Sequence, residues 1–241
     1  MLINFIRIFF LIGVLIGIFS KNNQIYAIDF ELQNKLTKRR VDFLFPKNTV
    51  SGLYRINCVY LNETIRPKSW PDRIPFGVGI SADRKRIHYL IYKSFFKRTI
   101  HDFSHKDFNF LNDVCIDKKG RVFVLDSKAE KIFYFDLKKD LSGLLFRGLL
   151  SVPNPKRCEV DVNGQLYILS SDNRFYSYSI NTYGIARLNN VVSNAINSNL
   201  KGKKVIDLTI NKNEEIIFLT SRNLIKFNSQ GIALDTLNLN K

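Results

Sequence analysis

Short apolar segments separated by polar turns recur along this chain of 241 residues, and one arrangement of them can be laid out four times. Each copy has an apolar strand, a polar turn that opens with Asp, Asn or Ser, and a second apolar strand. An Asp or Asn side chain can bond the backbone ahead of it, and Gly supplies the positive φ of a tight hairpin. Each copy is therefore predicted to be a β-hairpin. The copies are "VGISADRKRIHYL" (78–90), "VCIDKKGRVFVL" (114–125), "CEVDVNGQLYIL" (158–169) and "LTINKNEEIIFL" (208–219).

Each hairpin is followed by further strand-like segments. Third strands are predicted in "KIFYFDL", "RFYSYSI" and "NLIKFNS", and less regular fourth strands in "GLLFRGLL", "YGIARLNNV" and "GIALDTLNL". A repeat of four antiparallel strands is typical of a β-propeller blade. The second strand "RVFVLD" is apolar at successive positions, which is expected where neighbouring blades cover both faces of a sheet. The turn-opening residues that we align are Ser81, Asp117, Asp161 and Asn211.

The predicted fold class is therefore all-β, a β-propeller of four-stranded antiparallel blades. Upstream of the clear copies, "RVDFLFP" (40–46) and "GLYRINCVYLNETIRP" (52–67) are interpreted as the later strands of a degenerate unit. Four clear units and one degenerate unit predict five blades, with six as the alternative.

The first 27 residues have the pattern of an export signal. Arg7 is the only charge before the apolar run "IFFLIGVLIGIF" (8–19), and a short polar stretch then ends at Ala27. We predict a cleaved signal peptide at 1–27, an uncleaved membrane anchor being the alternative, and a single propeller domain at 28–241. Either form places the domain outside the cytoplasm, secreted or periplasmic. Contact with a membrane is expected only through an uncleaved leader.

The formal net charge of +16 makes this a basic protein. Such an excess predicts affinity for an anionic partner, although a composition rich in Lys and Asn would produce it without any function. The basic residues are scattered in predicted turns as pairs and triplets such as "TKRR", "DRKR" and "KGKK". Nucleic acid is not expected as the ligand, because the chain is exported.

Three cysteines, Cys58, Cys115 and Cys158, show no metal-ligand spacing. The hairpin alignment gives Cys158 the same position in its repeat as Val114, which is one residue before Cys115. Side chains one residue apart on a strand point to opposite faces. We therefore expect buried thiols and no bridge between Cys115 and Cys158.

The string "LNDVCIDKKGRVFVLDSKAEKIFYFDL" resembles the repeat of NHL-type propellers. The resemblance implies a scaffold that binds a protein or RNA, or one that carries an enzyme site. The matching positions are Asp117, Gly120, Val122, Phe123, Val124, Asp126 and Ser127. Residues at the position of Asp126 recur in every copy, so we expect them to lock a turn.

Two further propeller families share parts of this motif. "LNDVCIDKKGR" is similar to a stretch of gluconolactonase-like lactonases, and that resemblance implies that Asn112 and Asp113 help to hold a divalent metal. "GRVFVLDS" followed by "KIFYFDLKKD" partly resembles the secreted yellow/royal-jelly proteins, which are longer.

The candidate site lies where the inner strands of a propeller begin, because residues of every blade converge there. The hairpin alignment places Asn112, Asp113, Lys156, Arg157 and Asp207 at this channel mouth. The two cations beside a would-be metal site favour an anionic ligand over a metal. No cofactor is expected unless the lactonase alternative holds, in which case a divalent metal is.

Other candidate chemistry is weak. "HDFSH" places His101 and His105 four residues apart, a spacing that could hold zinc on a helix, but it falls in a predicted loop. His88 lies in a predicted strand with no evident partner.

The sequence thus favours an exported, non-catalytic propeller that binds a protein or an anionic ligand at one face. A metal-dependent lactonase or related hydrolase is the enzyme alternative, and a secreted structural protein of the yellow/royal-jelly kind is the third.

Overall fold

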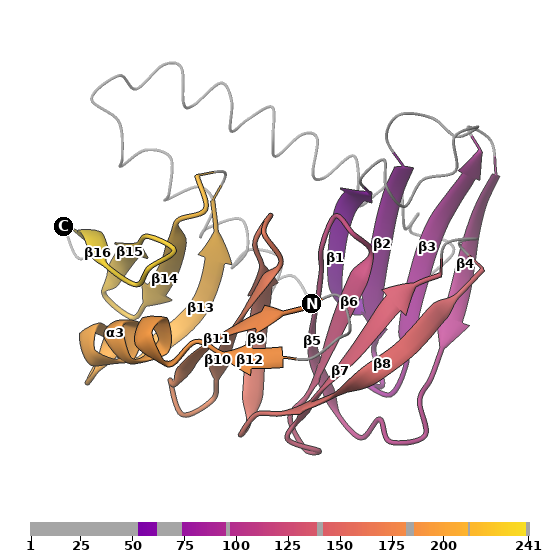
Figure 1. Ribbon diagram of the computed structural model, residues 1–241. Coiled ribbons are helices and arrows are strands. Elements are labelled where there is room, and N and C mark those ends of the chain that lie inside the picture. Colours follow the sequence, from indigo (N-terminus) through magenta and orange to yellow (C-terminus); the bar gives the residue numbers. More distant parts are fainter. Residues whose placement is uncertain are drawn as a thin grey trace. The chain divides into compact units, whose positions relative to one another are not determined.

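Four antiparallel sheets, each of four strands, follow one another along the chain (Figure 1). This computed structural model describes residues 53–61, 74–94, 97–138, 142–181, 186–211 and 213–239, all within one unit, Asn48–Lys241. The predicted leader and the segment 40–46 lie outside the described residues. No helix among the residues described has the length and apolar character needed to cross a bilayer.

The sheets are numbered as blades in chain order. Blade 1 contains β1 (Leu53–Leu61), β2 (Ile74–Ser81), β3 (Ile87–Ser94) and β4 (Lys97–Phe103). Blade 2 contains β5 (Leu111–Ile116), β6 (Arg121–Asp126), β7 (Lys131–Leu137) and β8 (Leu144–Ser151). Blade 3 contains β9 (Pro155–Val160), β10 (Gln165–Ser170), β11 (Phe175–Ile180) and β12 (Ala186–Leu188). Blade 4 contains β13 (Val205–Ile210), β14 (Ile216–Thr220), β15 (Asn223–Phe227) and β16 (Ala233–Asn238). The prediction of four-stranded antiparallel blades is confirmed.

The core is divided among the junctions between consecutive blades. One buried apolar cluster joins blades 1 and 2, a second joins blades 2 and 3, and a third joins blades 3 and 4. β6 shows why its sequence is apolar throughout. Val122 and Val124 face blade 1 whereas Phe123 and Leu125 face blade 3, so both faces of the sheet are buried as predicted.

The predicted hairpin turns are confirmed in blades 2 to 4. Oδ1 of Asp117 accepts the backbone N–H groups of Lys119 and Arg121, and Oδ1 of Asp161 accepts that of Gln165. Gly120 and Gly164 have φ of 75° and 82°, a backbone region that favours glycine.

The register of blade 1 corrects the sequence alignment. Ser81 ends the second strand of its blade, and its side chain and N–H close the β2–β3 turn on the carbonyl of Arg86. Ser170 closes the β10–β11 turn on Arg174 in the same way, so Ser81 corresponds to Ser170 and not to Asp117. The segment Leu53–Leu61 is accordingly the first strand of blade 1, and the interpretation of 52–67 as later strands of an upstream unit was wrong.

The residues that end the second strands act as turn locks, as the sequence predicted. Oδ1 of Asp126 accepts the N–H of Ala129 at 2.9 Å, and Oγ1 of Thr220 accepts that of Asn223 at 2.8 Å. These turns also bind the next blade, because the carbonyl of Arg84 accepts the N–H of Leu111 and Oδ1 of Asn173 accepts that of Val205. The recurring polar position is therefore a joint between blades as well as a turn.

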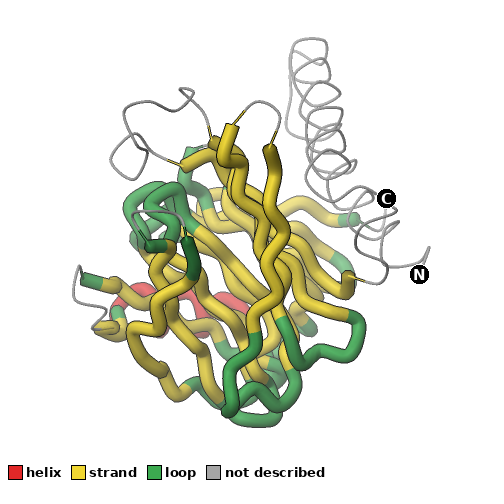
Figure 2. The backbone as a smooth tube through the Cα atoms, turned by 90° about the vertical axis from the view of Figure 1, so that its right-hand side faces the viewer, coloured by secondary structure: helices red, strands yellow, loops and turns green. Residues whose placement is uncertain are grey.

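A helix, α3 (Asn190–Leu200), connects blades 3 and 4 where the sequence predicted only a ragged strand. Asn189 caps it by accepting the N–H of Val192. Val192, Ile196 and Leu200 recur every fourth residue and pack into the cluster between blades 3 and 4. The strand before the helix, β12, is only three residues long. Figure 2 shows the helix in red among the yellow strands.

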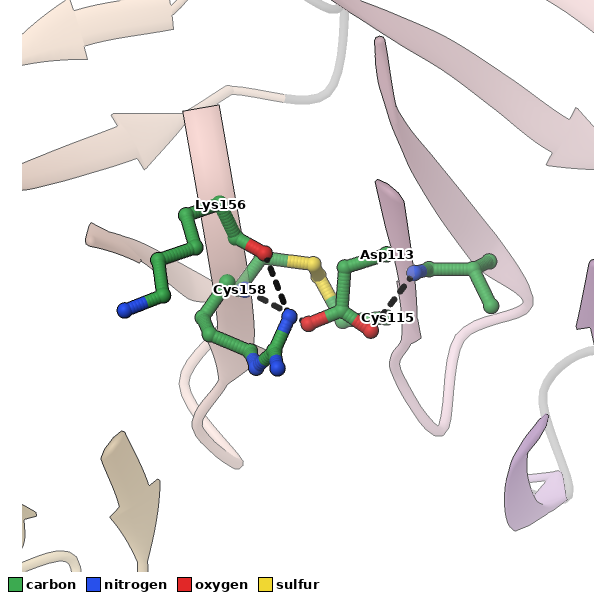
Figure 3. Close-up of a disulfide and its surroundings, with 6 residues drawn as sticks. Asp113, Cys115, Lys156 and Cys158 are labelled. Atoms are coloured by element: carbon green, nitrogen blue, oxygen red, sulfur yellow. Dashed lines mark hydrogen bonds between the residues drawn. A yellow bond between two sulfur atoms is a disulfide. The ribbon is translucent and has the colours of Figure 1, made fainter. Parts of the chain in front are cut away.

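Cys115 and Cys158 form a disulfide, which overturns the expectation of buried thiols at these two positions (Figure 3). Their Cα atoms are 5.9 Å apart, and both residues are buried. Blade 2 meets blade 3 with one face of its sheet, and blade 3 meets blade 2 with the opposite face of its own sheet. An offset of one residue between equivalent strands therefore brings two side chains together across a junction, which is the reverse of the expectation from the sequence.

Candidate functional site

Each inner strand contains one extra residue near its start. The pairing of β5 with β6 skips Asn112, that of β9 with β10 skips Lys156, and that of β13 with β14 skips Ile206. The pairing of β1 with β2 skips Tyr54 in the same place, which makes Arg55 the register equivalent of Asp113, Arg157 and Asp207. Such bulges re-aim side chains at the ends of strands. The positions predicted at the channel mouth therefore share one backbone feature, and its equivalent in blade 1 lies upstream of the sequence copy 78–90.

Asn112 and Lys156 bind the next blade at equivalent atoms. Nδ2 of Asn112 donates to the carbonyl of Pro155, the first residue of β9, at 3.3 Å. Nζ of Lys156 donates to the carbonyl of Val205, the first residue of β13, also at 3.3 Å. Both side chains are half-buried. Each therefore connects its own blade to the start of the following one.

Asp113 is held within the junction between blades 2 and 3. Its Oδ1 accepts the N–H of Val114 at 3.1 Å, and its Oδ2 accepts the N–H of Cys158 at 3.2 Å. Figure 3 shows this carboxylate beside the Cys115–Cys158 disulfide. The carboxylate is buried and bonded on both oxygens, so it satisfies the backbone at this position.

Arg157 and Asp207 form an ion pair across the junction between blades 3 and 4. Nε of Arg157 lies 3.2 Å from Oδ1 of Asp207, and Nη1 donates to the carbonyl of Lys156 at 2.9 Å. Oδ1 of Asp207 also accepts the N–H of Leu208 at 3.0 Å. The two charged side chains are 21% and 24% exposed, so this pair faces solvent in part.

The charges at this junction are unbalanced in favour of cations. Burial lowers the pKa of Lys156, the Arg157 guanidinium and Lys204 lower it further, and Asp207 raises it in part. The half-buried ammonium of Lys156 is thus under the influence of two other cations, of which Lys204 is exposed, and of one carboxylate. Lys204 lies in the triplet "KGKK" that the sequence analysis treated as a turn, and nothing in the sequence alone assigned it to this cluster.

The whole end of the blades at which the inner strands begin is basic. Its described turns and connections carry ten basic and four acidic residues. The described residues of the turns at the opposite end, which leave out 62–73, 139–141 and 212 among others, carry three basic and four acidic ones. The basic residues are Arg84, Lys85, Arg86, Lys106, Lys128, Arg174, Lys201, Lys203, Lys204 and Arg222. Two of the four acids, Asp83 and Asp172, are paired with arginines.

The residues implied by the lactonase resemblance do not fit a divalent metal. Both oxygens of Asp113 are bonded to backbone N–H groups, and Oδ1 of Asn112 accepts Nη1 of Arg84 at 3.5 Å. In the part of the chain that the structure describes, no three His, Cys, Asp or Glu side chains are grouped so that they could hold a metal ion.

The histidines have structural contacts of their own. Nδ1 of His88 lies 2.5 Å from Oδ1 of Asp102, its cross-strand neighbour, so the expectation that His88 lacks a partner was wrong. His101 stacks on Tyr89, and His105 packs on the rings of Phe133 and Phe146.

Comparison with known proteins shows a similarity of fold and no family or function. No family model and no curated protein matches the sequence. The structure is similar to a protein from Lactobacillus plantarum, with a TM-score of 0.50, 9% identity and coverage of 68% of this chain and 54% of that one. It is also similar to virginiamycin B lyase from Staphylococcus aureus, with a TM-score of 0.48, 12% identity and coverage of 78% and 60%. A candidate gluconolactonase matches with a TM-score of 0.49, 16% identity and coverage of 69% and 61%.

At these identities the likeness concerns the fold alone. The chain spans between about half and three fifths of the length of these structures. The four-stranded antiparallel sheets define the class of the protein: an all-β fold of the β-propeller type, of which four blades are described.

Proposed function

We propose that this protein is an exported, non-catalytic β-propeller of the NHL type that binds an anionic ligand between blades 3 and 4. The single observation that carries the proposal is the cationic cluster of Lys156, Arg157 and Lys204, in which Asp207 pairs with Arg157 and the positive charges outnumber the negative one. The ligand would enter at the basic end of the blades, where the inner strands begin.

The cluster has unused donors for such a ligand. An ammonium group has three N–H donors and a guanidinium five. Lys156 makes one hydrogen bond and Arg157 uses Nε and Nη1, so among the described residues Nη2 of Arg157 has no acceptor. Partial burial strengthens the interaction of these donors with an anion, because solvent screens them less than it screens a surface lysine.

Two observations support the other parts of the proposal, which are export and the NHL type. The disulfide between Cys115 and Cys158 is consistent with export, because such bonds persist in oxidising compartments. The turn geometry of Asp117, Gly120 and Asp126 gives a physical basis for the NHL-like motif of blade 2. The lactonase alternative finds no support in the arrangement of Asn112 and Asp113.

Isothermal titration calorimetry with a heparin-derived octasaccharide, at low and at physiological ionic strength, tests the proposal. We expect Lys156→Gln to weaken binding about tenfold, since a hydrogen bond to a charged group contributes about 1.5 kcal/mol. Gln keeps an N–H donor and a polar side chain of nearly the same length, so the variant should fold.

Lys118→Gln is the matched control. It removes the same charge from an exposed turn at the opposite end of the blades, and we expect less than about a twofold change. Equal losses in the two variants would show that binding follows net charge alone, and absence of binding by the wild type would overturn the proposal.

A further inference from the structure

A cavity of about 280 Å³ lies between blades 2 and 3, away from the cationic cluster. The side chains that line it are apolar except for Tyr134, and polar atoms of the lining residues also contribute to its surface. Blade 2 contributes residues of β6, β7 and β8, and blade 3 contributes residues of β10, β11 and β12. The lining residues are Phe123, Ile132, Tyr134, Gly148, Leu149, Leu150, Leu166, Ile180 and Ala186.

Two local features of the sequence leave this space open. Gly148 pairs with Tyr134 across β7 and β8, and cross-strand partners point to the same face of a sheet. A side chain at position 148 would therefore point into the cavity, and a Cβ placed there meets no atom within 4 Å. On the other wall, β12 is only three residues long and begins with the small residue Ala186. The cavity thus exists because one strand lacks a side chain and the facing strand is short.

Among the described residues, no charged side chain lines the cavity. The one polar side chain in it, Tyr134, donates its hydroxyl proton to Oδ1 of Asp136 at 2.7 Å, and Asp136 in turn pairs with Arg147. Burial, the hydrogen bond to Asp136 and the charge of Asp136 all raise the pKa of Tyr134, so its hydroxyl stays neutral. Leu149, which is among the lining residues, is 47% exposed, so the cavity is in contact with solvent.

From this geometry we infer that the cavity is a binding site for a small, uncharged, mainly aromatic molecule. A buried apolar cavity of about 150 Å³ accommodates benzene. The space here is about twice as large, which corresponds to a bicyclic aromatic compound. The volume lies near the lower end of the range of natural ligand pockets, about 300 Å³. This site is independent of the proposed anion site, which lies at a different junction.

Titration with N-phenyl-1-naphthylamine, an uncharged bicyclic probe that fluoresces in apolar surroundings, tests the inference. We expect a saturable rise in fluorescence with one probe bound per chain. Gly148→Leu should lower the affinity at least tenfold, because its side chain fills the space that the probe needs. Ala186→Leu fills the same cavity from blade 3 and gives a second test if the first variant fails to fold.

Ser151→Leu is the matched control, because it adds the same side chain to β8 at an exposed position that does not line the cavity. It should bind the probe as the wild type does. The inference is overturned if the wild type shows no saturable binding, if a folded Gly148→Leu or Ala186→Leu variant binds as tightly as the wild type, or if Ser151→Leu loses binding to the same extent.

Discussion

Two junctions, one between blades 2 and 3 and one between blades 3 and 4, share the same backbone arrangement. They differ in how many of their hydrogen-bond donors are left unused. In both, the extra residue of an inner strand donates to the first carbonyl of the next inner strand, from Asn112 in one case and Lys156 in the other. The following residue carries a charge, which is the carboxylate of Asp113 or the guanidinium of Arg157.

We call the junction between blades 2 and 3 the closed junction, because its charged side chains are bonded within the protein, and the junction between blades 3 and 4 the open one. Asp113 is bonded on both oxygens, the disulfide crosses beside it, and Arg121 of blade 2 donates to the carbonyls of Gly164 and Ile180 in blade 3. At the second junction, cations replace Asn112 and Asp113, their donors are only partly used, and the pairing carboxylate of Asp207 is partly exposed.

The comparison teaches that a repeated joint can gain unused donors by substitution at two adjacent register positions. The backbone bulge and the interblade hydrogen bond are kept, so the fold is preserved. Only the charge and the number of unused donors change. The predictions that follow test whether the closed junction supplies stability and the open one supplies binding.

The largest expected effect is on the closed junction. Arg121 is buried, pairs with Asp117 at 2.6 Å and donates to two carbonyls of blade 3. Arg121→Ala leaves the buried carboxylate of Asp117 without its cation, so the free energy of unfolding should fall by about 3–5 kcal/mol in urea titrations. Arg147→Ala removes an exposed pair with Asp136 and should cost less than about 1 kcal/mol. If both variants lost the same free energy of unfolding, the buried ion pair of Arg121 would contribute no more stability than the surface pair of Arg147.

Removal of the disulfide should have the next largest effect. The bond joins residues separated by 43 positions, and closing a loop of this size restricts the unfolded chain. The double variant Cys115→Ala with Cys158→Ala should therefore lose about 2–4 kcal/mol of unfolding free energy. A reductant should destabilise the wild type by a similar amount and leave the double variant unchanged. If the reductant destabilised the double variant as much as the wild type, the loss of stability would not come from this disulfide.

At the open junction, Asp207→Asn should increase the affinity for the heparin octasaccharide about two- to fivefold. Asp207 competes with an added anion for the guanidinium of Arg157, and the amide retains an oxygen for the N–H of Leu208. Asp235→Asn, an exposed carboxylate on β16, controls for net charge. If both variants gain equally, no local competition exists.

The smallest effect concerns pH. The pKa of Lys156 is lowered in the folded state, so the unfolded chain binds the proton more readily. The unfavourable charge is fully present below the folded pKa and is relieved as pH rises toward the ordinary lysine value of 10.5. The wild type should therefore gain stability relative to Lys156→Met in thermal melts across this alkaline window. A parallel pH dependence of the two proteins would argue against a buried charge.

Much of the fold could be predicted because the hairpin turns depend on local chemistry. Asp117 with Gly120 and Asp161 with Gly164 specify the same turn in any context, and β6 is apolar on both faces because both faces are covered. Blade 1 was misaligned because "SADRKR" resembles a first hairpin turn, whereas its serine closes the second. The spacing of Val192, Ile196 and Leu200 was visible in the sequence and could have indicated α3.

The site could be predicted only as a set of positions. The alignment of the inner strands selected Asn112, Asp113, Lys156, Arg157 and Asp207, and all five lie at the bulges or directly after them. Their different roles depend on which groups face them from the next blade, and this information is absent from any single strand. The disulfide, the contribution of Lys204 and the cavity at Gly148 depend on the same packing between blades.

The most direct test of the account is a crystal structure of the protein soaked with tungstate, an oxyanion that anomalous scattering locates without ambiguity. The account predicts a tungstate between Nζ of Lys156 and Nη2 of Arg157, and none at the junction between blades 2 and 3, where Asp113 occupies the equivalent position. Tungstate confined to the exposed lysines, or bound equally at both junctions, would contradict it.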